Sequence, residues 1–271
     1  MDSDLLNTFL KTAMTAARLA GDIIMKNLGH LSKGDIQNKQ AFDFVTKVDR
    51  WSEAVIVQTI RERFPSHSFL AEETLTQQGT DSYRWIIDPL DGTTNYIHSY
   101  PMFSVSIALE YKGEILVGVV FDPLKDELFH GIKGRGASLN NSPIRVSEIN
   151  LLGNSLIATG FPFRKKDLLD LYLQAFKSIF YEVSDLRRAG SAAIDLAYIA
   201  AGRFEGFFEL NLSPWDIAAG SLLIREAGGY VTDFGGGKDY LLTGNVVAGN
   251  KDVQDKILKK IEGVFKGIIE K

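Results

Sequence analysis

One stretch of this chain, Trp85 to Asn95, constrains the fold and the chemistry more than any other. It reads Trp-Ile-Ile-Asp-Pro-Leu-Asp-Gly-Thr-Thr-Asn, so an apolar run stops in two carboxylates, a glycine and two hydroxyl residues. Residues 83–87 are rich in β-branched and aromatic side chains, which favours a strand, and the proline and glycine that follow turn the chain. The sequence therefore predicts that Asp88 and Asp91 lie at the end of a strand.

A short helical turn is expected to begin at Thr93. Because glycine has no side chain, Gly92 lets the backbone approach a ligand closely. The free N–H groups of a helix start carry partial positive charge and would face an anion such as phosphate. An Asp-Gly pair is also common turn chemistry, so this stretch alone leaves an ordinary polar turn open.

A second acidic pair, Glu72 and Glu73, follows the short apolar run 68–71. Two adjacent strands of this kind could bring their acidic ends together. Divalent ions such as Mg²⁺ prefer oxygen ligands and usually keep several waters, so a few carboxylates from strand ends suffice. The pair therefore favours a metal site over a simple turn.

A third acid, Asp216, lies in the first turn of a predicted helix over 214–227. Ser213 is a suitable N-cap, Pro214 suits the first helical position, and two glycines end the segment at 228–229. An acid in the first turn is favoured by the helix dipole. Judged locally, Asp216 is a capping carboxylate, because nothing nearby requires a ligand.

These motifs resemble those of the inositol monophosphatase family of Mg²⁺-dependent, lithium-sensitive phosphatases. Residues 85–95 are similar to the first signature of that family, and residues 215–229 are similar to the second, in the same order and spacing. Glu72-Glu73, the segment 43–49 and the segment 188–193 stand where the family keeps its accessory motifs. The resemblance covers essentially the whole chain.

The resemblance implies a set of metal ligands and replaces the capping interpretation of Asp216 with metal binding. It implies that Glu72, Asp88 and the carbonyl of Leu90 hold one Mg²⁺. Asp88, Asp91 and Asp216 would hold a second, so that Asp88 bridges the two. A third, weaker ion near Glu72 would give two to three ions per site.

The resemblance also implies that Thr93 and Glu72 orient a water on the first metal, while Asp49 supports Thr93. Two cations about 3.5 to 4 Å apart can activate water and stabilise a leaving oxygen, so no covalent nucleophile is required. The absence of cysteine and the scattering of the four histidines agree with this chemistry. Asp49 also precedes an amphipathic run, where it is a favoured N-cap, and both roles can hold at once.

The residues expected at the substrate are Asp91, Gly92, Thr93, Gly190, Ser191, Ala192, Glu209 and Lys39. Gly190 to Ala192 open an apolar helical run whose free amides could face a substrate oxygen, or they form an ordinary helix start. In relatives that take inositol, a glutamate at the position of Glu209 bonds sugar hydroxyls; the alternative is a surface strand carboxylate. Lys39 stands in the flexible polar stretch 37–40, where the family has a lysine near the metals, or it is a solvated loop lysine.

Periodicity predicts two long helices, one with apolar positions from Leu6 to Ile24 and one over 51–64, followed mainly by strands. Runs at 103–109, 115–121 and 127–132 predict an antiparallel meander. From about residue 150, strand and helix patterns alternate, which indicates α/β organisation. The expected strands are 155–159, 181–186, 204–210, 230–233 and 246–248, and the expected helices are 167–180, 192–201, 214–227 and one from 252.

We therefore expect an N-terminal α+β half over 1–147 that carries most metal ligands. A C-terminal α/β half over 148–271 would carry Asp216 and the substrate-binding residues, and the two halves would form one compact catalytic unit. The resemblance implies an α/β (α+β) fold in which an antiparallel sheet with two long helices and a mixed α/β half form a layered α-β-α-β-α sandwich. It also implies metals between the halves, and commonly a homodimer.

Composition excludes several classes of protein. The chain has 271 residues, 45% of them hydrophobic, and a formal net charge of -4, which is ample for a large core but too acidic for generic nucleic-acid binding. The acidic start Met1 to Asp4 has no signal-peptide pattern, and no apolar run approaches the ~20 residues of a membrane span. A cytoplasmic location is expected.

The expected activity is Mg²⁺-dependent hydrolysis of a phosphate monoester, with myo-inositol monophosphate first, because Gly190 to Ala192 and Glu209 fit a polyol-binding rim. If Arg187 and Arg188 point into the cleft, fructose 1,6-bisphosphate or another sugar or nucleotide bisphosphate is favoured instead, since guanidinium pairs suit phosphate oxygens. A regulatory binding protein on the same fold is the non-enzyme alternative. The intact acid set favours the enzyme.

Overall fold

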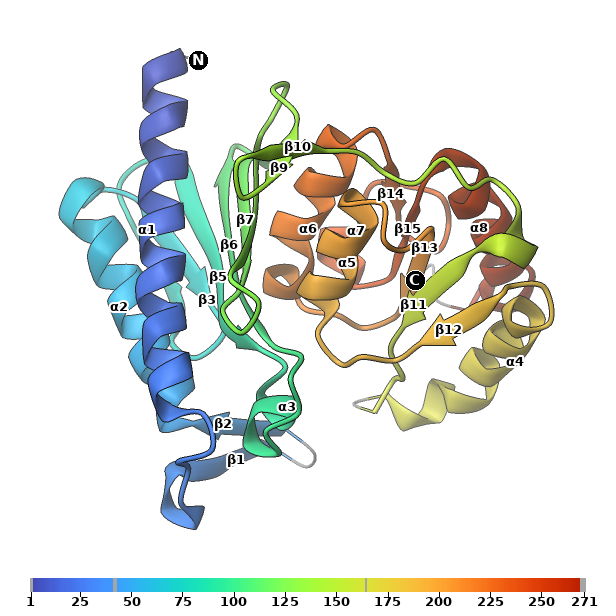
Figure 1. Cartoon of the computed structure of the whole chain (residues 1–271), viewed down its shortest axis with the longest axis horizontal. Helices are drawn as coiled ribbons and strands as arrows, with labels where there is room; N and C mark the ends of the chain where they lie inside the picture. The colour runs from blue at the N-terminus through green and yellow to red at the C-terminus, as the bar shows by residue number, and fades with distance from the viewer. Residues whose placement is uncertain (1, 41–42, 164, 269–271) are drawn as a thin grey trace.

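The computed structural model describes residues 2–40, 43–163 and 165–268, which form five layers (Figure 1). Helices α1 (Ser3–Asn27) and α2 (Lys47–Arg63) cover one face of a large sheet. Helices α5 (Ala192–Ala200) and α6 (Pro214–Glu226) lie between this sheet and a smaller one, whose outer face is covered by α4 (Leu169–Phe180) and α8 (Lys251–Phe265). The predicted α-β-α-β-α sandwich is confirmed.

The large sheet is antiparallel except at one pair of strands. Its strands are β3 (Ser68–Ala71), β4 (Leu75–Gln77), β5 (Tyr83–Asp91), β6 (Ser104–Tyr111), β7 (Glu114–Asp122), β8 (Glu127–Ile132), β9 (Ala137–Leu139) and β10 (Ser142–Ile144). Their spatial order is β10-β9-β8-β7-β6-β5-β3-β4, and β6, β7 and β8 form the predicted meander. Strands β3 and β5 run parallel, so their carboxyl ends lie at the same edge.

The smaller sheet contains both parallel and antiparallel pairs of strands. Its strands are β11 (Leu156–Thr159), β12 (Asp185–Arg187), β13 (Gly206–Glu209), β14 (Tyr230–Thr232) and β15 (Val246–Gly249), in the order β12-β11-β13-β15-β14. Strand β11 runs parallel to both of its neighbours, whereas β15 runs antiparallel to β13 and β14. The division of the chain between residues 147 and 148 stays a prediction.

The middle helices fix the spacing of the two sheets. Helix α5 is buried along its whole length, and α6 is buried from Asp216 to Ile224, as expected for helices with apolar residues on every side. Small residues allow the layers to approach closely. A side chain on Gly118 of β7 would meet the backbone of Ala219, and one on Gly220 would meet Leu196 of α5.

Three sequence predictions for individual elements are wrong. Helix α2 begins at Lys47 and not at Trp51, because Thr46 caps it by accepting hydrogen bonds from the N–H groups of Val48 and Asp49. Strand β12 is shorter than the predicted 181–186, because Glu182 N donates to Ile179 O in a turn that ends α4. The stretch 37–40 is not a loop.

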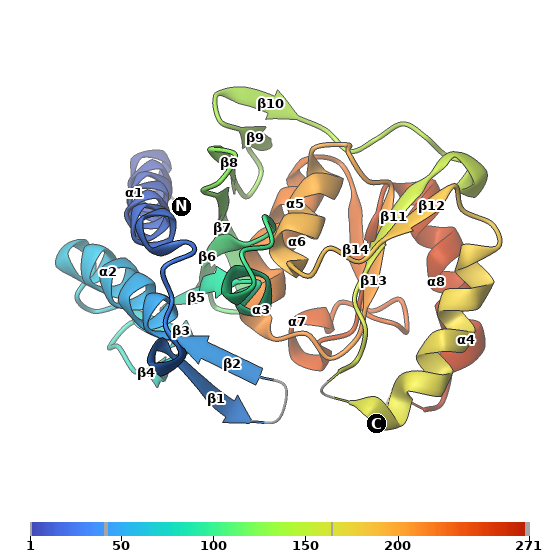
Figure 2. The same cartoon turned by 60° about the horizontal axis from the view of Figure 1, so that its bottom comes forward.

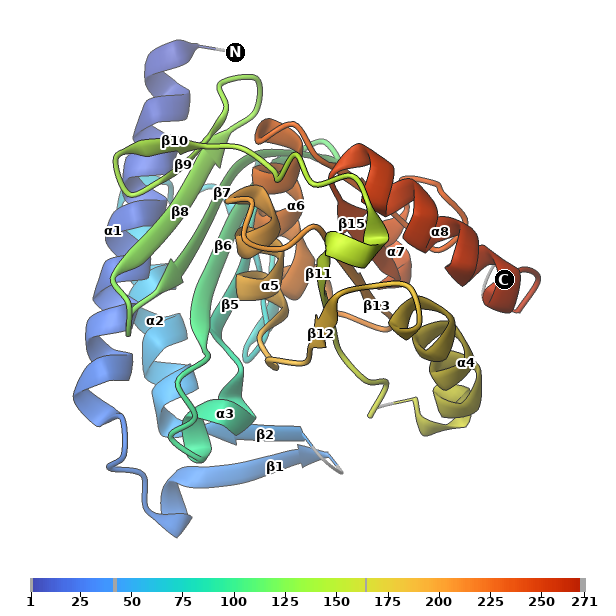
Figure 3. The ribbon, with the colours of Figure 1, turned by 45° about the vertical axis from the view of Figure 1, so that its right-hand side comes forward.

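That stretch belongs to β1 (Ile36–Gln40), which pairs with β2 (Asp43–Thr46) in an antiparallel hairpin. Figures 2 and 3 both show the hairpin beside the short helix α3 (Thr93–Ile97), at the end of the large sheet. The remaining regular elements are α7 (Tyr240–Thr243) and short 3-10 turns at Lys33–Asp35, Leu152–Asn154 and Lys166–Leu168. None of the helices in the described ranges combines the length and apolar character that crossing a bilayer requires.

We predict that Gly118→Ala destabilises the fold, because a Cβ at this position would lie 2.8 Å from the carbonyl oxygen of Ala219. Such overpacking typically lowers the free energy of unfolding by about 1–3 kcal/mol. The control is Gly263→Ala in α8, where a Cβ meets nothing within 4 Å. Denaturant unfolding should show a loss for the first variant and a slight gain for the second; equal effects would contradict the close approach of α6 to the sheet.

Candidate active site

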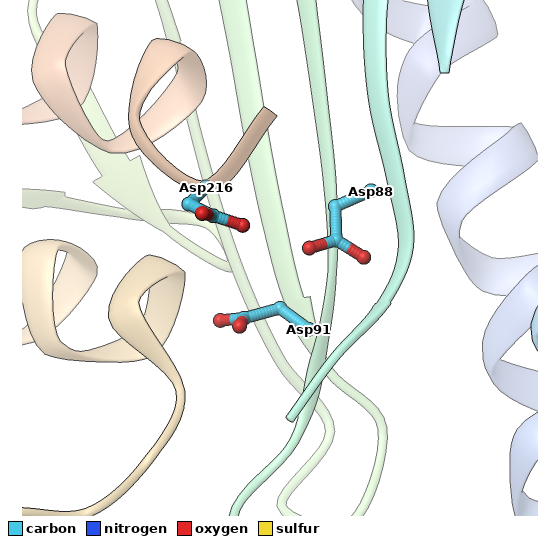
Figure 4. A group of neighbouring side chains, drawn as sticks. All are labelled: Asp88, Asp91 and Asp216. Atoms are coloured by element: carbon cyan, nitrogen blue, oxygen red, sulfur yellow. The ribbon is translucent and has the colours of Figure 1, made fainter. Parts of the chain in front are cut away.

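Three carboxylates converge at the edge of the large sheet. Asp88 and Asp91 come from the end of β5, and Asp216 comes from the first turn of α6. One oxygen from each can be chosen so that all three lie within 4.8 Å of one another, and Figure 4 shows the side chains pointing toward a common centre. Such a group of oxygen atoms could hold a metal ion.

A bulge at the end of β5 turns both aspartates to the same side. Asp88 pairs with Ser106 of β6 and Asp91 pairs with Ser104, so three steps along β5 match two steps along β6. Side chains three residues apart point to opposite faces in a regular strand, and one extra residue reverses the second of them. The bulge is secured by Leu90 N, which donates to Asp88 Oδ1 at 2.9 Å.

The carboxylate of Asp91 also links the end of β5 to the start of α5. It accepts hydrogen bonds from Ser191 Oγ at 2.6 Å and from Ala193 N at 2.9 Å, at the start of α5. Asn95 Nδ2 makes a second link, since it lies 2.9 Å from Ala189 O and 2.8 Å from Met102 O. The sequence analysis did not single out Asn95.

Asp216 is both a capping residue and a member of the carboxylate group. Its Oδ2 accepts a hydrogen bond from Ser213 N at 2.7 Å, and Ser213 and Pro214 occupy the predicted N-cap and first helical positions. The local interpretation as a cap is therefore correct. It does not exclude metal binding, because a carboxylate has further lone pairs to offer.

Asp49 is not the N-cap of α2 that the sequence predicted, because Thr46 takes that position. It is the third residue of α2, and its Oδ2 accepts hydrogen bonds from Thr46 N at 2.8 Å and Thr46 Oγ1 at 2.5 Å. Its Oδ1 lies 2.8 Å from Thr93 Oγ1, which is also 3.1 Å from Leu90 O. The fully buried Asp49 therefore holds Thr93 in a fixed orientation.

The other residues expected at the site, apart from Lys39, line one cleft of about 430 Å³. Glu72, Gly92, Gly190, Ser191, Ala192 and Glu209 all line it, together with the three aspartates, Leu90 and Thr93. Glu72 follows β3, and its N–H donates to Ile87 O of β5. The backbone of Lys39 lies in β1, but its side chain is outside the described part of the structure.

Glycines bring the cleft walls close together. Gly92 has a φ of 94°, and a Cβ there would lie 2.9 Å from Met102 O, so only glycine fits without strain. Gly160 leaves room for the carboxylate of Glu209, which a Cβ would overlap. Glu205, by contrast, is buried and accepts from Leu156 N at 2.7 Å, away from the cleft residues.

The two neighbouring arginines point in different directions. Arg188 lines the cleft, and its guanidinium lies over Gly190. Arg187 forms an exposed ion pair with Asp185 instead. Lys166 and Asp195 also line the cleft but were not singled out from the sequence, although an acid within the otherwise apolar run 192–200 was a usable signal for Asp195.

Burial makes the acids of the site difficult to ionise when no cation is present. Burial raises the pKa of Asp91 to about 6, although the hydrogen bonds from Ser191 and Ala193 oppose the rise. Burial likewise raises the pKa of Asp49 to about 6. The pKa of Asp88 is raised well above its ordinary value, by burial first and then by the neighbouring carboxylates.

Comparison with known proteins confirms the resemblance of the motifs. The model of the Inositol monophosphatase family matches residues 5–265. The Nus factor SuhB of Escherichia coli (strain K12) is 49% identical over 254 residues, or 93% of this chain and 95% of that protein. The structure of the extragenic suppressor protein suhB from Bartonella henselae has a TM-score of 0.92 and 41% identity, covering 96% of this chain and 100% of that one. The structure of inositol monophosphatase from Anabaena (Nostoc) sp. PCC 7120 has a TM-score of 0.85 and 41% identity, covering 96% and 97%.

The raised pKa values predict how stability depends on pH when divalent ions are removed. A folded carboxyl with a pKa of about 6 keeps a proton that the unfolded chain, near 3.8, has already lost. The stability it contributes is therefore complete below pH 4 and is lost as pH rises through 6. In chelator, the melting temperature of the wild type relative to Asp91→Asn should fall between pH 4 and 8.

Added Mg²⁺ should raise the melting temperature of the wild type more at pH 8 than at pH 5, because protons compete with the ion for the same oxygens. The control is Asp255→Asn, an exposed position on α8, which should follow the wild type. The opposite result would be a wild-type melting temperature that rises relative to that of Asp91→Asn as pH increases in chelator. It would contradict the raised pKa of Asp91.

Proposed function

Because this chain belongs to the inositol monophosphatase family, whose function is phosphatase chemistry, we propose that it is a Mg²⁺-dependent enzyme that hydrolyses myo-inositol monophosphate to inositol and phosphate. The observation that carries this proposal is the convergence of Asp88, Asp91 and Asp216 on one centre in the cleft. These ligands come from two segments far apart in the chain. The fold brings their carboxylates to the same point.

The donor set fits a hard divalent cation. Every candidate ligand offers oxygen, which Mg²⁺ prefers, and the group contains no histidine or cysteine. We assign Glu72, Asp88 and the Leu90 carbonyl to one ion, and Asp88, Asp91 and Asp216 to a second, with a weaker third ion near Glu72. When bound, Mg²⁺ would supply charge neutralisation at the phosphate and activation of water.

The residues of the chain itself orient the nucleophile. If the Thr93 hydroxyl donates its proton to Asp49 Oδ1, at 2.8 Å, its lone pairs are left to accept a hydrogen bond from water. Glu72, at the end of the neighbouring parallel strand β3, lines the same space and would accept the second proton of that water. A carboxylate and a fixed hydroxyl thus define the direction from which water attacks phosphorus.

The substrate lies, in this proposal, between the carboxylates and the smaller sheet. Gly92, Thr93 and Asp91 would face the phosphate, and Gly190, Ser191 and Ala192 would face the oxygens of the alcohol. Glu209, which lies over Gly160 on the far wall, would accept hydrogen bonds from hydroxyl groups. Lys39 stays a further candidate for the phosphate side, and lithium sensitivity stays a prediction.

A bisphosphate is the second candidate substrate. It is supported by Arg188 and Lys166, two cationic side chains that line the cleft, and an arginine can bind phosphate oxygens through two nitrogen atoms. Against it, Arg187 points away and pairs with Asp185, so the paired guanidinium groups that a second phosphate would favour are not assembled. Inositol monophosphate therefore remains first.

A homodimer and a non-catalytic role are two further possibilities. The exposed Leu169, Leu173 and Phe180 of α4, followed by Tyr181, offer an apolar surface that supports the homodimer. The E. coli relative is named as a Nus factor and not as a phosphatase, which supports a binding role on this fold. Phosphate release from inositol 1-phosphate, with and without Mg²⁺, separates enzyme from binding protein.

We predict that Asp91→Asn and Asp216→Asn each lower kcat by two or more orders of magnitude while the chain stays folded. Each change removes a negative charge from the proposed second ion and leaves the departing oxygen without stabilisation, an effect of about 3 kcal/mol or more. Steady-state phosphate release at saturating Mg²⁺ measures the loss, with Asp255→Asn as the matched control. Near-normal rates in either variant would remove that residue from the assigned ligands.

The substrate assignment predicts that Glu209→Gln lowers kcat/KM for inositol 1-phosphate far more than for a simple aryl phosphate, which has no hydroxyl groups to bond. A panel that includes fructose 1,6-bisphosphate measures both the variant and the wild type. A wild-type preference of tenfold or more for the bisphosphate would reverse the order of the two candidates. Equal losses on both esters would remove Glu209 from the substrate site.

A further inference from the structure

Asp195 is a buried acid that lines the cleft, and one of its carboxyl oxygens has no hydrogen-bond partner among the residues that the structure describes. Its side chain is 2% exposed, and its Oδ1 is enclosed and has no hydrogen-bond partner among the described residues. Arg188 lies near enough to favour the ionised form, yet no hydrogen bond or ion pair links the two in the described structure. Leaving a buried polar group unpaired costs about 1–3 kcal/mol, so such groups mark strain or a missing ligand.

The position of Asp195 on α5 directs it toward the substrate. Ala192 and Asp195 are three residues apart and therefore lie on the same side of the helix, and both line the cleft. One turn earlier, Ser191 and Ala193 bond Asp91, so the same helix start connects the metal side to Asp195.

The neighbours of Asp195 define the chemistry of its partner. Burial raises the pKa of Asp195, and the negative charges of Glu209 and Asp91 raise it further. A second phosphate would add negative charge to this wall and could not donate protons to it. A hydroxyl group can donate to a carboxylate or accept from a carboxylic acid, so it pairs with Asp195 in either protonation state.

We propose that Asp195 is a substrate-binding residue that, together with Glu209, recognises hydroxyl groups of the alcohol part of the substrate. The cleft is thereby selective for monoesters of polyhydroxylic alcohols over esters of the same carbon skeleton without hydroxyls. This inference rests on the proposed phosphatase function and adds a residue that determines specificity. It explains why an acid interrupts an otherwise apolar, fully buried helix.

Two esters with one skeleton test the inference: glycerol 2-phosphate, with two free hydroxyls, and isopropyl phosphate, with none. We expect Asp195→Ala to lower kcat/KM for glycerol 2-phosphate about tenfold, an effect within the range for the loss of a buried hydrogen bond. The value for isopropyl phosphate should change less than about twofold, the loss should lie mainly in KM, and Asp195→Asn should be intermediate. The melting temperature should stay equal or rise, because no bond within the protein is lost.

Equal losses on both esters, or a lower melting temperature in Asp195→Asn, would overturn the inference in favour of a structural role. If the wild type hydrolyses neither these two esters nor inositol 1-phosphate, the proposed function fails, and binding of free myo-inositol, followed by saturation-transfer NMR, decides about Asp195 separately. A saturation-transfer signal of myo-inositol that appears with the wild type and is lost in Asp195→Ala supports the inference. A signal that the substitution leaves unchanged, or no signal with the wild type, overturns the inference. Asp255→Asn is the control in each measurement.

Discussion

The carboxylate of Asp91 accepts one hydrogen bond from Ser191 Oγ and one from Ala193 N, and the rest of the site depends on these two bonds. They tie the start of α5 to the end of β5, and so fix the smaller sheet's side of the cleft relative to the larger sheet. They also partly compensate the charge of the half-buried Asp91, which lies close to Asp88 and Asp216. What they leave uncompensated is the repulsion among the three acids, which only a proton or a cation can relieve.

The carboxylates of Asp88, Asp216 and Asp49 each accept a hydrogen bond from a nearby backbone N–H group, and this fixes their orientation before any ion binds. Leu90 N holds Asp88 across the bulge, Ser213 N holds Asp216 in the capping box, and Thr46 holds Asp49. All are backbone N–H groups, which cannot rotate away as side chains can. Ligands held in this way lose little conformational entropy on binding, which favours a well-defined ion position.

The sequence was sufficient wherever a local rule decided the outcome. A strand before Asp88 and a helix that begins after Ser213 follow from residue type and spacing, although the strand runs through Pro89 to Asp91 instead of ending at residue 87. The start of α2 was missed because Thr46 and Asp49 can each cap a helix, and only the packed chain shows that Asp49 is the third helical residue. The convergence of Asp216 with Asp91 could not follow from periodicity, because it depends on how α6 packs between the sheets; only resemblance supplied it.

The sequence also could not predict the directions in which long side chains point. Arg187 and Arg188 are neighbours in sequence, yet of the two only Arg188 lines the cleft, whereas Arg187 at the end of β12 pairs with Asp185. The sequence could not predict that Asp195 lacks a hydrogen-bond partner among the described residues, because this depends on the burial of the whole of α5 in the packed structure.

The central claim is that Asp88, Asp91 and Asp216 share a divalent cation. The most direct measurement is the anomalous diffraction of a crystal soaked in Mn²⁺, which replaces Mg²⁺ in oxygen sites. The account predicts a strong anomalous peak within coordination distance of all three carboxylates, and its loss in Asp216→Asn. A Mn²⁺-soaked wild-type crystal with no peak between these side chains, or with manganese bound only elsewhere, would contradict it.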